Sequence, residues 1–336
     1  MVTAFTFNCQ AYNQHPRRTF FLKEADSVQV ITLVDNYVNG LLSSSQGVIR
    51  PRLDVVTGER PGEPALAEFG WSALVRISVD GRWHSILFDT GLGKQALLNN
   101  VRALKINLKE IEALVISHGH PDHTAATPET LSEIDSDELP VILHPNALRR
   151  TVLVLPSGEK LNRGYFLEER DLHERGARLD KTKSPTPLAS DAALVTGEIP
   201  RRTEYEKGMP PNVHYRIVDG NLVHDQEILD DQALVVNVRD KGLIVISGCA
   251  HAGIINTARY AKEVSGVDKV FAIAGGFHLT GDYYAPILDR TVQDMGEMAP
   301  KMVLPSHCTG IRALIKIANA APDAFIENSV GTTFVF

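Results

Sequence analysis

The sequence predicts an α/β fold in which strands and helices form layers around one core. Short runs rich in β-branched residues alternate along the chain with helical runs. Hydrophobic residues make up 43% of the 336 positions, which is enough for a large core. One long polar stretch, residues 157–230, breaks the alternation. We therefore expect a single domain that spans residues 1–336 and carries this stretch as an insertion.

The strands are expected where β-branched residues dominate a run and the run stops at Asp, Asn or Gly. Near the start of the chain such runs cover residues 28–36, 71–80 and 84–91. Further strand runs cover residues 108–117, 139–146, 232–248, 269–276 and 301–307. The expected helices cover residues 252–265, 285–299 and 311–321. Strands that meet helices in this order imply layers of both kinds packed together.

The stretch 157–230 differs in composition from the rest of the chain. It is poor in apolar runs, rich in Pro and Gly, and mixed in charge. Too little of it is apolar to form a core of its own, so we interpret it as a lid-like insertion. A lid of this kind is expected to shape the entrance for a small-molecule substrate.

Charge and cysteine content narrow the function classes. A formal net charge of -7 without a cluster of Lys and Arg argues against a nucleic-acid surface. No run reaches the roughly 18 apolar residues of a membrane span, and no signal peptide is apparent. Three cysteines are too few for a disulfide framework, so reduced thiols and a cytoplasmic location are expected. The oligomeric state stays open.

The segment VISHGHPDHTAA, residues 115–126, concentrates metal-binding side chains. Three histidines and one aspartate fall within six positions, directly after an apolar run. Imidazole is the commonest protein ligand of zinc, and a loop between a strand and a helix can preorganise several ligands. The motif divides into the pair His118 and His120 and, after Pro121, the pair Asp122 and His123. All four are predicted ligands.

This motif resembles the His-x-His-x-Asp-His signature of the metallo-β-lactamase superfamily. FDTG at residues 88–91 and LPSHCTG at residues 304–310 resemble two further superfamily segments. The segments TGEIPR (196–201), SGCAHAGIINT (247–257) and GGFHL (275–279) are similar to the branch named for dihydropterin ribofuranosylaminobenzene phosphate synthase. The resemblance implies an αββα sandwich with a metal site at one edge of two packed sheets.

The resemblance also implies roles for single residues. Asp89 corresponds to the early strand-end aspartate, which orients a ligand imidazole or holds water, and His307 to the late ligand histidine. Cys249 stands where the superfamily usually has an aspartate between two metals. The usual third histidine, expected before residue 232, is missing, and His251 is the predicted substitute. One or two Zn²⁺ ions are expected, with Mn²⁺, Fe²⁺ or Mg²⁺ as alternatives.

The remaining site predictions concern catalysis and substrate. Asp122 or Asp89 is expected to guide the proton of an activated water. His278 follows two glycines at a strand end, and three roles stay open for it: substrate binding, acid catalysis or metal ligation. Arg201 and its neighbour Arg202 are candidates for holding substrate phosphates. Cys308 is left as packing beside His307.

These features favour a hydrolase-like metalloenzyme that acts on a phosphorylated or ester small molecule. The synthase-like branch implies instead a transferase in which the cations stabilise a leaving diphosphate. Two other classes stay open: a metal-binding sensor without turnover, and an iron-dependent redox protein of the same fold. The sequence contains neither a Gly-x-Ser-x-Gly elbow nor a phosphate loop, so activation is expected to come from metal.

Overall fold

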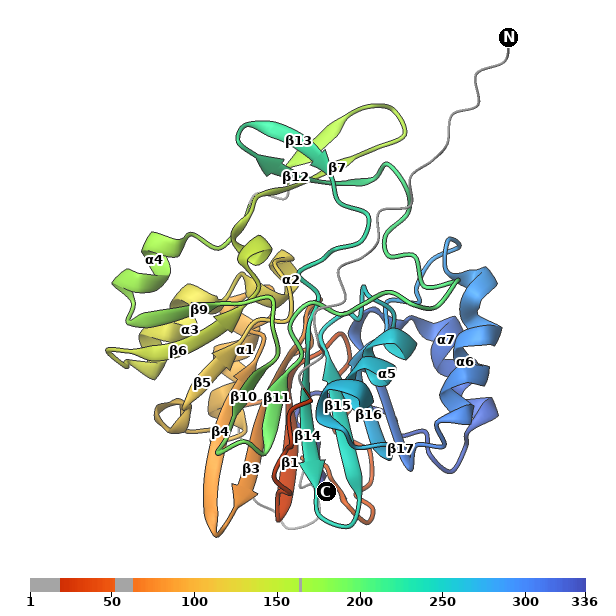
Figure 1. Ribbon diagram of the computed structural model, residues 1–336. Coiled ribbons are helices and arrows are strands. Elements are labelled where there is room, and N and C mark those ends of the chain that lie inside the picture. Colours follow the sequence, from red (N-terminus) through yellow and green to blue (C-terminus); the bar gives the residue numbers. More distant parts are fainter. Residues whose placement is uncertain (1–18, 52–62, 163–164) are drawn as a thin grey trace.

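The computed structural model describes residues 19–51, 63–162 and 165–336. Two large β-sheets lie face to face with helices on their outer sides, and a small third sheet stands apart from them (Figure 1). The eight-stranded sheet has the order β2-β18-β1-β3-β4-β5-β6-β9. Its strands are β1 (Ser27–Val34), β2 (Val48–Ile49), β3 (Ser72–Val79), β4 (Arg82–Phe88), β5 (Ala113–Val115), β6 (Leu139–Leu143), β9 (Ala177–Lys181) and β18 (Thr333–Val335).

The second large sheet has six strands in the order β10-β11-β14-β15-β16-β17. Its strands are β10 (Thr186–Leu188), β11 (Ala193–Val195), β14 (Ala233–Val238), β15 (Gly242–Ser247), β16 (Val270–Gly276) and β17 (Met302–Ser306). The pairs β15–β16 and β16–β17 are parallel, as are β4–β5 and β5–β6 in the first sheet. Parallel strands end at a common edge, so the carboxyl ends of β15, β16 and β17 lie side by side.

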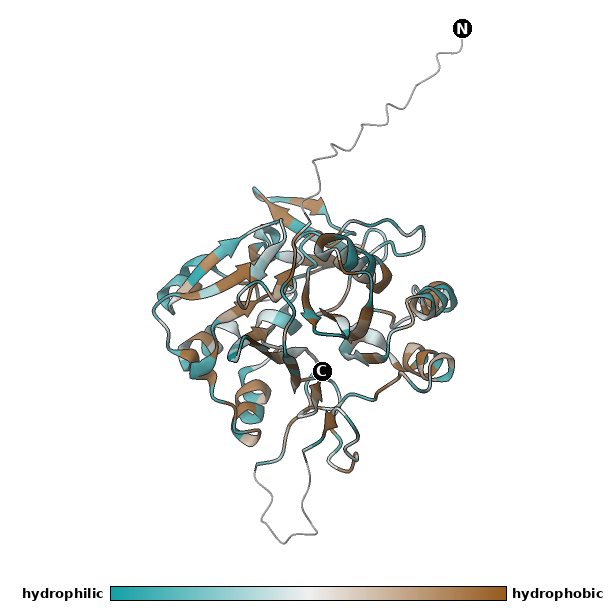
Figure 2. Cartoon of the chain, turned by 60° about the horizontal axis from the view of Figure 1, so that its bottom comes forward, coloured by the Kyte–Doolittle hydropathy of each residue, from teal (hydrophilic) through white to brown (hydrophobic). Residues whose placement is uncertain are grey.

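Alternate residues of the strands pack into different cores. In β15, Ile244 and Ile246 face the core between the two sheets, whereas Leu243 and Val245 face the outer helices. Successive side chains of a strand point to opposite faces, so a strand covered on both faces reads as a continuous apolar run. Figure 2 shows this concentration of hydrophobic residues on the central strands. The αββα sandwich expected from the resemblance is confirmed.

The helices cover the outer faces of the two sheets. Helices α1 (Lys94–Ala103), α3 (Thr127–Ile134) and α4 (Glu169–Glu174) contribute side chains to the core outside the first sheet. Helices α5 (Ile254–Ser265), α6 (Leu288–Glu297) and α7 (Ile311–Ala320) do so for the second sheet. The remaining short helices are α2 (Pro121–Thr124), η1 (Leu108–Glu110), η2 (Pro145–Leu148), η3 (Ala285–Ile287) and η4 (His307–Thr309). No helix in the described ranges has the length and apolarity to cross a bilayer.

The stretch 157–230 is not one lid, which corrects the sequence-based interpretation. Its strands β9, β10 and β11 belong to the two large sheets, and Ala193, Leu194 and Val195 are fully buried. Only a four-stranded sheet of order β13-β12-β7-β8 stands apart, at the top of Figure 1. Its strands are β7 (Thr151–Val154), β8 (Lys160–Asn162), β12 (His214–Val218) and β13 (Asn221–His224). The strands β10 and β11 have three residues each and β9 alternates apolar with polar residues, so none of the three shows as an apolar run in the sequence.

Two expected elements also differ in detail. The long run 232–248 is an antiparallel hairpin, β14 and β15, because Asp240 adopts a positive φ of 62° at the turn. The run 108–117 begins as the short helix η1, and only Ala113–Val115 forms a strand, β5. The other expected strands and the three expected helices are present within a few residues of their predicted bounds.

Candidate metal centre

Three histidines form the first group of donor atoms. His118 and His120 lie in the loop after β5, and His251 lies in the turn after β15. His118 Nε2 is 3.0 Å from His120 Nδ1, which is 3.2 Å from His251 Nε2. Four nitrogens placed tetrahedrally around zinc at 2.0–2.1 Å are about 3.3 Å apart. The three imidazoles are therefore spaced as ligands of one cation.

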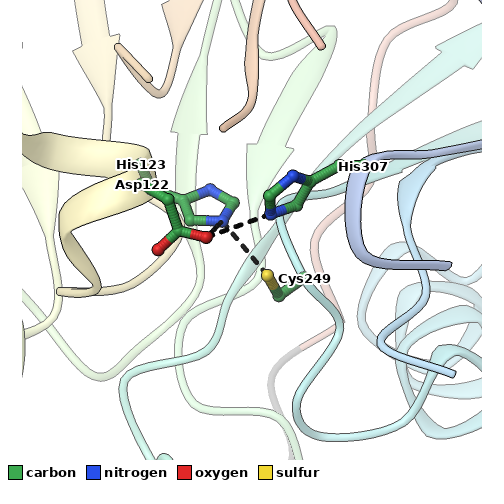
Figure 3. Close-up of side chains that lie close together, drawn as sticks. All are labelled: Asp122, His123, Cys249 and His307. Atoms are coloured by element: carbon green, nitrogen blue, oxygen red, sulfur yellow. Dashed lines mark hydrogen bonds and ion pairs between the residues drawn. The ribbon is translucent and has the colours of Figure 1, made fainter. Parts of the chain in front are cut away.

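A second group lies beside the first and is drawn in Figure 3. Asp122 and His123, both in α2, meet His307 from the end of β17. Asp122 Oδ2 is 3.2 Å from His307 Nε2 and 3.7 Å from His123 Nε2. His123 is fully buried, and Asp122 and His307 are each 8% exposed. One carboxylate and two imidazoles again suit a divalent cation.

Cys249 belongs to both groups. Its sulfur is 3.1 Å from His123 Nε2, and its donor atom lies within 4.8 Å of those of His118 and His251 as well as those of Asp122 and His307. The turn after β15 thus places one sulfur between the two sets of donors. This is the place that the resemblance assigns to a bridging carboxylate. The residues present fit one or two divalent cations.

Asp89 orients the His123 ring through a contact with its Nδ1. Its Oδ2 is 2.7 Å from His123 Nδ1 and accepts a hydrogen bond of 2.6 Å from Ser117 Oγ. Ser117 Oγ in turn lies 2.9 Å from His118 Nδ1. Such contacts fix the orientation of a ligand imidazole. These contacts with His123 and Ser117 make Asp89 a positioning residue.

His214 supports His120 from the small third sheet. The Nε2 atoms of the two rings are 3.0 Å apart, and His214 Nδ1 lies 3.2 Å from the carbonyl oxygen of Asp225. In the same sheet Arg216 pairs with Asp225 and Asp230, and Asp230 accepts a 2.7 Å hydrogen bond from the Gly119 amide. The third sheet therefore holds the loop that carries two donor histidines.

Strained backbone marks the same sheet edge. Asp89, Ala250, His278 and His307 have φ values of 59°, 54°, 44° and 49°, and each follows a strand end. Non-glycine residues adopt this left-handed conformation at an energetic cost, which persists where the surroundings enforce it. Three of the four carry side chains of the candidate centre. The strain is therefore consistent with a functional site.

The electrostatic environment favours a cation. Burial lowers the pKa of His118 and of His251 well below the usual value, which keeps both rings neutral as ligands must be. Burial also acts to lower the pKa of His123, but the carboxylates of Asp89 and Asp122 outweigh it and raise this pKa to about 9. In the metal-free protein, the proton on His123 therefore lies where the carboxylates of Asp89 and Asp122 attract positive charge. A bound cation would experience the same attraction.

A cavity of about 210 Å³ opens beside the first donor group. Its walls include His251 and His278, together with the aromatic rings of Tyr205, Phe277, Tyr283 and Tyr284. The His278 ring lies 4.2 Å from the His251 ring and 5.2 Å from that of Tyr284. Nδ1 of His278 has no hydrogen-bond partner in the described part of the chain. His278 is therefore placed between the donor groups and the cavity.

Arg201 is engaged elsewhere. Its guanidinium donates to the carbonyl oxygens of Ile199, Glu227 and Ile228. These contacts tie two backbone segments together, and Arg201 does not line the cavity. The structure therefore gives no support to Arg201 as a phosphate-binding residue. Its neighbour Arg202 pairs with Glu263 and likewise lies outside the cavity beside His278.

Comparison with known proteins identifies the family. The model of the metallo-beta-lactamase superfamily matches residues 67–223. The 7,8-dihydropterin-6-methyl-4-(beta-D-ribofuranosyl)-aminobenzene-5'-phosphate synthase of Methanocaldococcus jannaschii is 30% identical over 251 residues, which are 74% of this chain and 84% of the relative. The chain belongs to the metallo-beta-lactamase superfamily. An uncharacterized protein of the same organism is 34% identical over 268 residues, 79% of this chain and 92% of that protein.

A solved structure supports the superfamily fold. A metal-dependent hydrolase of the beta-lactamase superfamily superposes with a TM-score of 0.66 at 22% identity, covering 91% of this chain and 98% of its own. Asp230 and Asp231 lie directly before residue 232, in the segment where a third histidine was expected from the sequence. Asp231 accepts a 2.8 Å hydrogen bond from the Ala252 amide and so fixes the turn that presents His251. This contact places a carboxylate next to His251, the predicted substitute ligand.

From the sequence, the role of Cys249 stayed open and His214 was not singled out. Cys249 carried a signal in its strand-end position, whereas His214 carried none, because it lies 94 residues from His120. Only the pairing of β12 with β7 brings it to the donor loop.

Substituting His214 by alanine is expected to weaken metal binding at the three-histidine group by about 10- to 100-fold, because the His120 ring loses its outer partner. The measurement is competition with a chelator of known affinity. His224→Ala is the matched control, since His224 lies on the neighbouring strand and makes an edge-to-face contact with Tyr215. Glutamine at position 214 should restore part of the affinity. Equal affinities for the two alanine variants would contradict a positioning role for His214.

Metal binding at the second group is expected to release a proton. Below pH 9 His123 is protonated in the metal-free protein, and a cation at its Nε2 must displace that proton. Affinity should therefore rise about tenfold per pH unit between about pH 6 and pH 8, whereas His118 and His251 are already neutral. Calorimetry of the Cys249→Ser variant in buffers of different ionisation enthalpy counts these protons. Release of equal numbers of protons at the two donor groups would contradict the conclusion that His123 is protonated in the metal-free protein while His118 and His251 are neutral.

Proposed function

We propose that the chain is a zinc-type metalloenzyme that cleaves or transfers a phosphorylated or ester group of a small molecule. The observation that carries this proposal is the joint position of the two donor groups around Cys249, directly beside the cavity that contains His278. Bound divalent cations supply Lewis-acid activation of water and of a phosphoryl or carbonyl oxygen. Superfamily membership and the metal-dependent hydrolase with the same fold support this class.

The chain's own residues provide orientation and proton transfer. Asp89 and Ser117 hold the rings of His123 and His118, and Asp122 presents a carboxylate oxygen within 3.2 Å of His307. Burial alone would raise the pKa of Asp122, but His123 and His307 keep it well below the usual value, so the carboxylate stays ionised. His278 lines the cavity, and its buried Nδ1 has no hydrogen-bond partner in the described part of the chain, so we assign it proton donation to a leaving group.

The cavity walls favour a substrate with a flat ring. Tyr205, Tyr283, Tyr284 and Phe277 provide aromatic faces, which stack on conjugated rings. The relative named as a dihydropterin-containing phosphate synthase is consistent with such a ring. A transferase that joins a dihydropterin to an aminobenzene ribose phosphate, with loss of diphosphate, is therefore the second candidate.

One assay separates the two candidates. Protein reloaded with Zn²⁺ is incubated with a dihydropterin-6-methyl diphosphate, with and without the aminobenzene ribose phosphate. A condensed product with released diphosphate indicates the transferase, and a hydroxymethyl product without the second substrate indicates the hydrolase. Tyr284→Ala should raise KM about tenfold or more while the bound metal stays constant. Turnover that is independent of added metal, in protein verified as metal-free, would contradict both candidates.

A further inference from the structure

A third set of donors lies at the same sheet edge and has a different chemical character. We propose that Cys249, Cys308 and His278 form a sulfur-rich site that binds one thiophilic cation, such as Cd²⁺ or Cu⁺. The donor atoms of these residues lie within 4.8 Å of one another. Both cysteines are free and buried. This inference does not depend on the proposed reaction.

The fold brings the three side chains together from three adjacent strand ends. Cys249 follows β15, His278 follows β16 and Cys308 follows β17, and these strands are neighbours in the second sheet. The two sulfurs are 3.3 Å apart although a whole strand separates their backbones. The side chains of Cys249, after β15, and Cys308, after β17, must therefore meet across the end of β16, which lies between these two strands.

A glycine at the end of β16 makes this meeting possible. A Cβ atom at Gly276 would lie 2.7 Å from Cys308 Sγ and 2.4 Å from the carbonyl oxygen of Gly248. Sulfur and carbon do not approach so closely without displacement, so a side chain here would push the Cys308 thiol aside. The absence of a side chain at Gly276 thus leaves the space in which the two sulfurs converge.

The donor set selects a soft ion. Two thiolates and one imidazole favour thiophilic cations, whereas the groups containing His120 and Asp122 suit harder ones. Two sulfurs bound tetrahedrally to zinc at about 2.3 Å are about 3.8 Å apart, so the present 3.3 Å would open by about half an ångström for an ion of that size and by somewhat more for the larger Cd²⁺. The cavity beside His278 gives the ion a path of entry.

Occupation of this site has a consequence for the other two groups. Cys249 is the only residue common to all three sets of donors that the described ranges present. A cation held by Cys249 and Cys308 withdraws that sulfur from the histidine and aspartate donors. A thiophilic ion should therefore compete with the second Zn²⁺ ion for the shared sulfur.

The test is ¹¹³Cd NMR of metal-free full-length protein titrated with Cd²⁺, in a Cys9→Ser background so that only two thiols remain. Each sulfur ligand moves the cadmium resonance to lower field. The first equivalent is expected to give a two-sulfur resonance. Cys308→Ser should convert it to a one-sulfur resonance and weaken Cd²⁺ binding about 100-fold or more.

Two further measurements test the site, the first of them also in case the Cys308→Ser variant does not fold. Cadmium-edge X-ray absorption of the protein with both cysteines counts the sulfur neighbours without relying on the fold of a variant, and two sulfurs are expected. Zn²⁺ stoichiometry of Cys308→Ser is expected to stay unchanged, since Cys308 belongs to neither of the other groups. A one-sulfur cadmium site that Cys308→Ser leaves unaltered would overturn the inference, whatever the enzyme assays show.

Discussion

Replacing His120 by alanine is expected to strip most of the bound metal and to lower kcat/KM by at least about a thousandfold. The physical reason is the central position of its Nδ1, which lies 3.0 Å from His118 Nε2 and 3.2 Å from His251 Nε2. Without this nitrogen the first group keeps two imidazoles, too few to hold a cation against water and competing ligands. Elemental analysis of protein purified without added metal measures the loss.

A surface histidine provides the control for this variant. His173 lies on α4 next to Glu169, and its side chain is 51% exposed. His173→Ala should retain both the metal and the activity. Full metal stoichiometry in His120→Ala, with its fold verified by circular dichroism, would show that His120 is not a ligand.

The second large effect is expected at Cys249. Burial and the neighbouring Cys308 raise the pKa of the Cys249 thiol well above its usual value, so the metal-free protein holds it protonated. A cation must displace that proton before it can use the sulfur. We therefore expect Cys249→Ala to bind one divalent cation and Cys249→Asp to bind the second at least about tenfold more tightly than the unmodified chain at neutral pH.

Titration of the metal-free forms with Zn²⁺ decides this prediction. The aspartate variant supplies a charged carboxylate without a proton to displace, whereas the alanine variant supplies no donor between the groups. A buried carboxylate without metal is costly, so the melting temperature of Cys249→Asp should rise steeply when Zn²⁺ is added. Two equally tight sites in all three forms would show that Cys249 is a packed thiol and that the other residues alone hold the metals.

The sequence was sufficient for those parts of the centre that are local. His118, His120, Asp122 and His123 lie within six positions, and the chain between a strand and a helix leaves them little freedom to separate. The strand-end positions of His251 and His307 were also visible, because apolar runs stop directly before them. The fold class followed from the same runs, since strands covered on both faces must alternate with the helices that cover them.

The composition of residues 157–230 led to a wrong prediction of the fold in this stretch. Polar content and short strands suggested a lid, but β9, β10 and β11 complete the two large sheets. β9 and β10 lie at sheet edges and β11 lies between β10 and β14. Such short strands gain much of their stability from backbone hydrogen bonds to a neighbouring strand, and these bonds leave no pattern in the side chains. A periodicity argument therefore assigns such segments to loops.

The sequence by itself determined the layered fold, the donor loop and the family, because each depends on residues that are close along the chain or on apolar periodicity. Tertiary structure alone decided two features: the contact of His214 with His120, and the approach of Cys308 to Cys249 over Gly276. Each joins residues at least 59 positions apart. Such contacts depend on strand order and sheet register, which many sequences could satisfy and which only packing of the whole chain fixes.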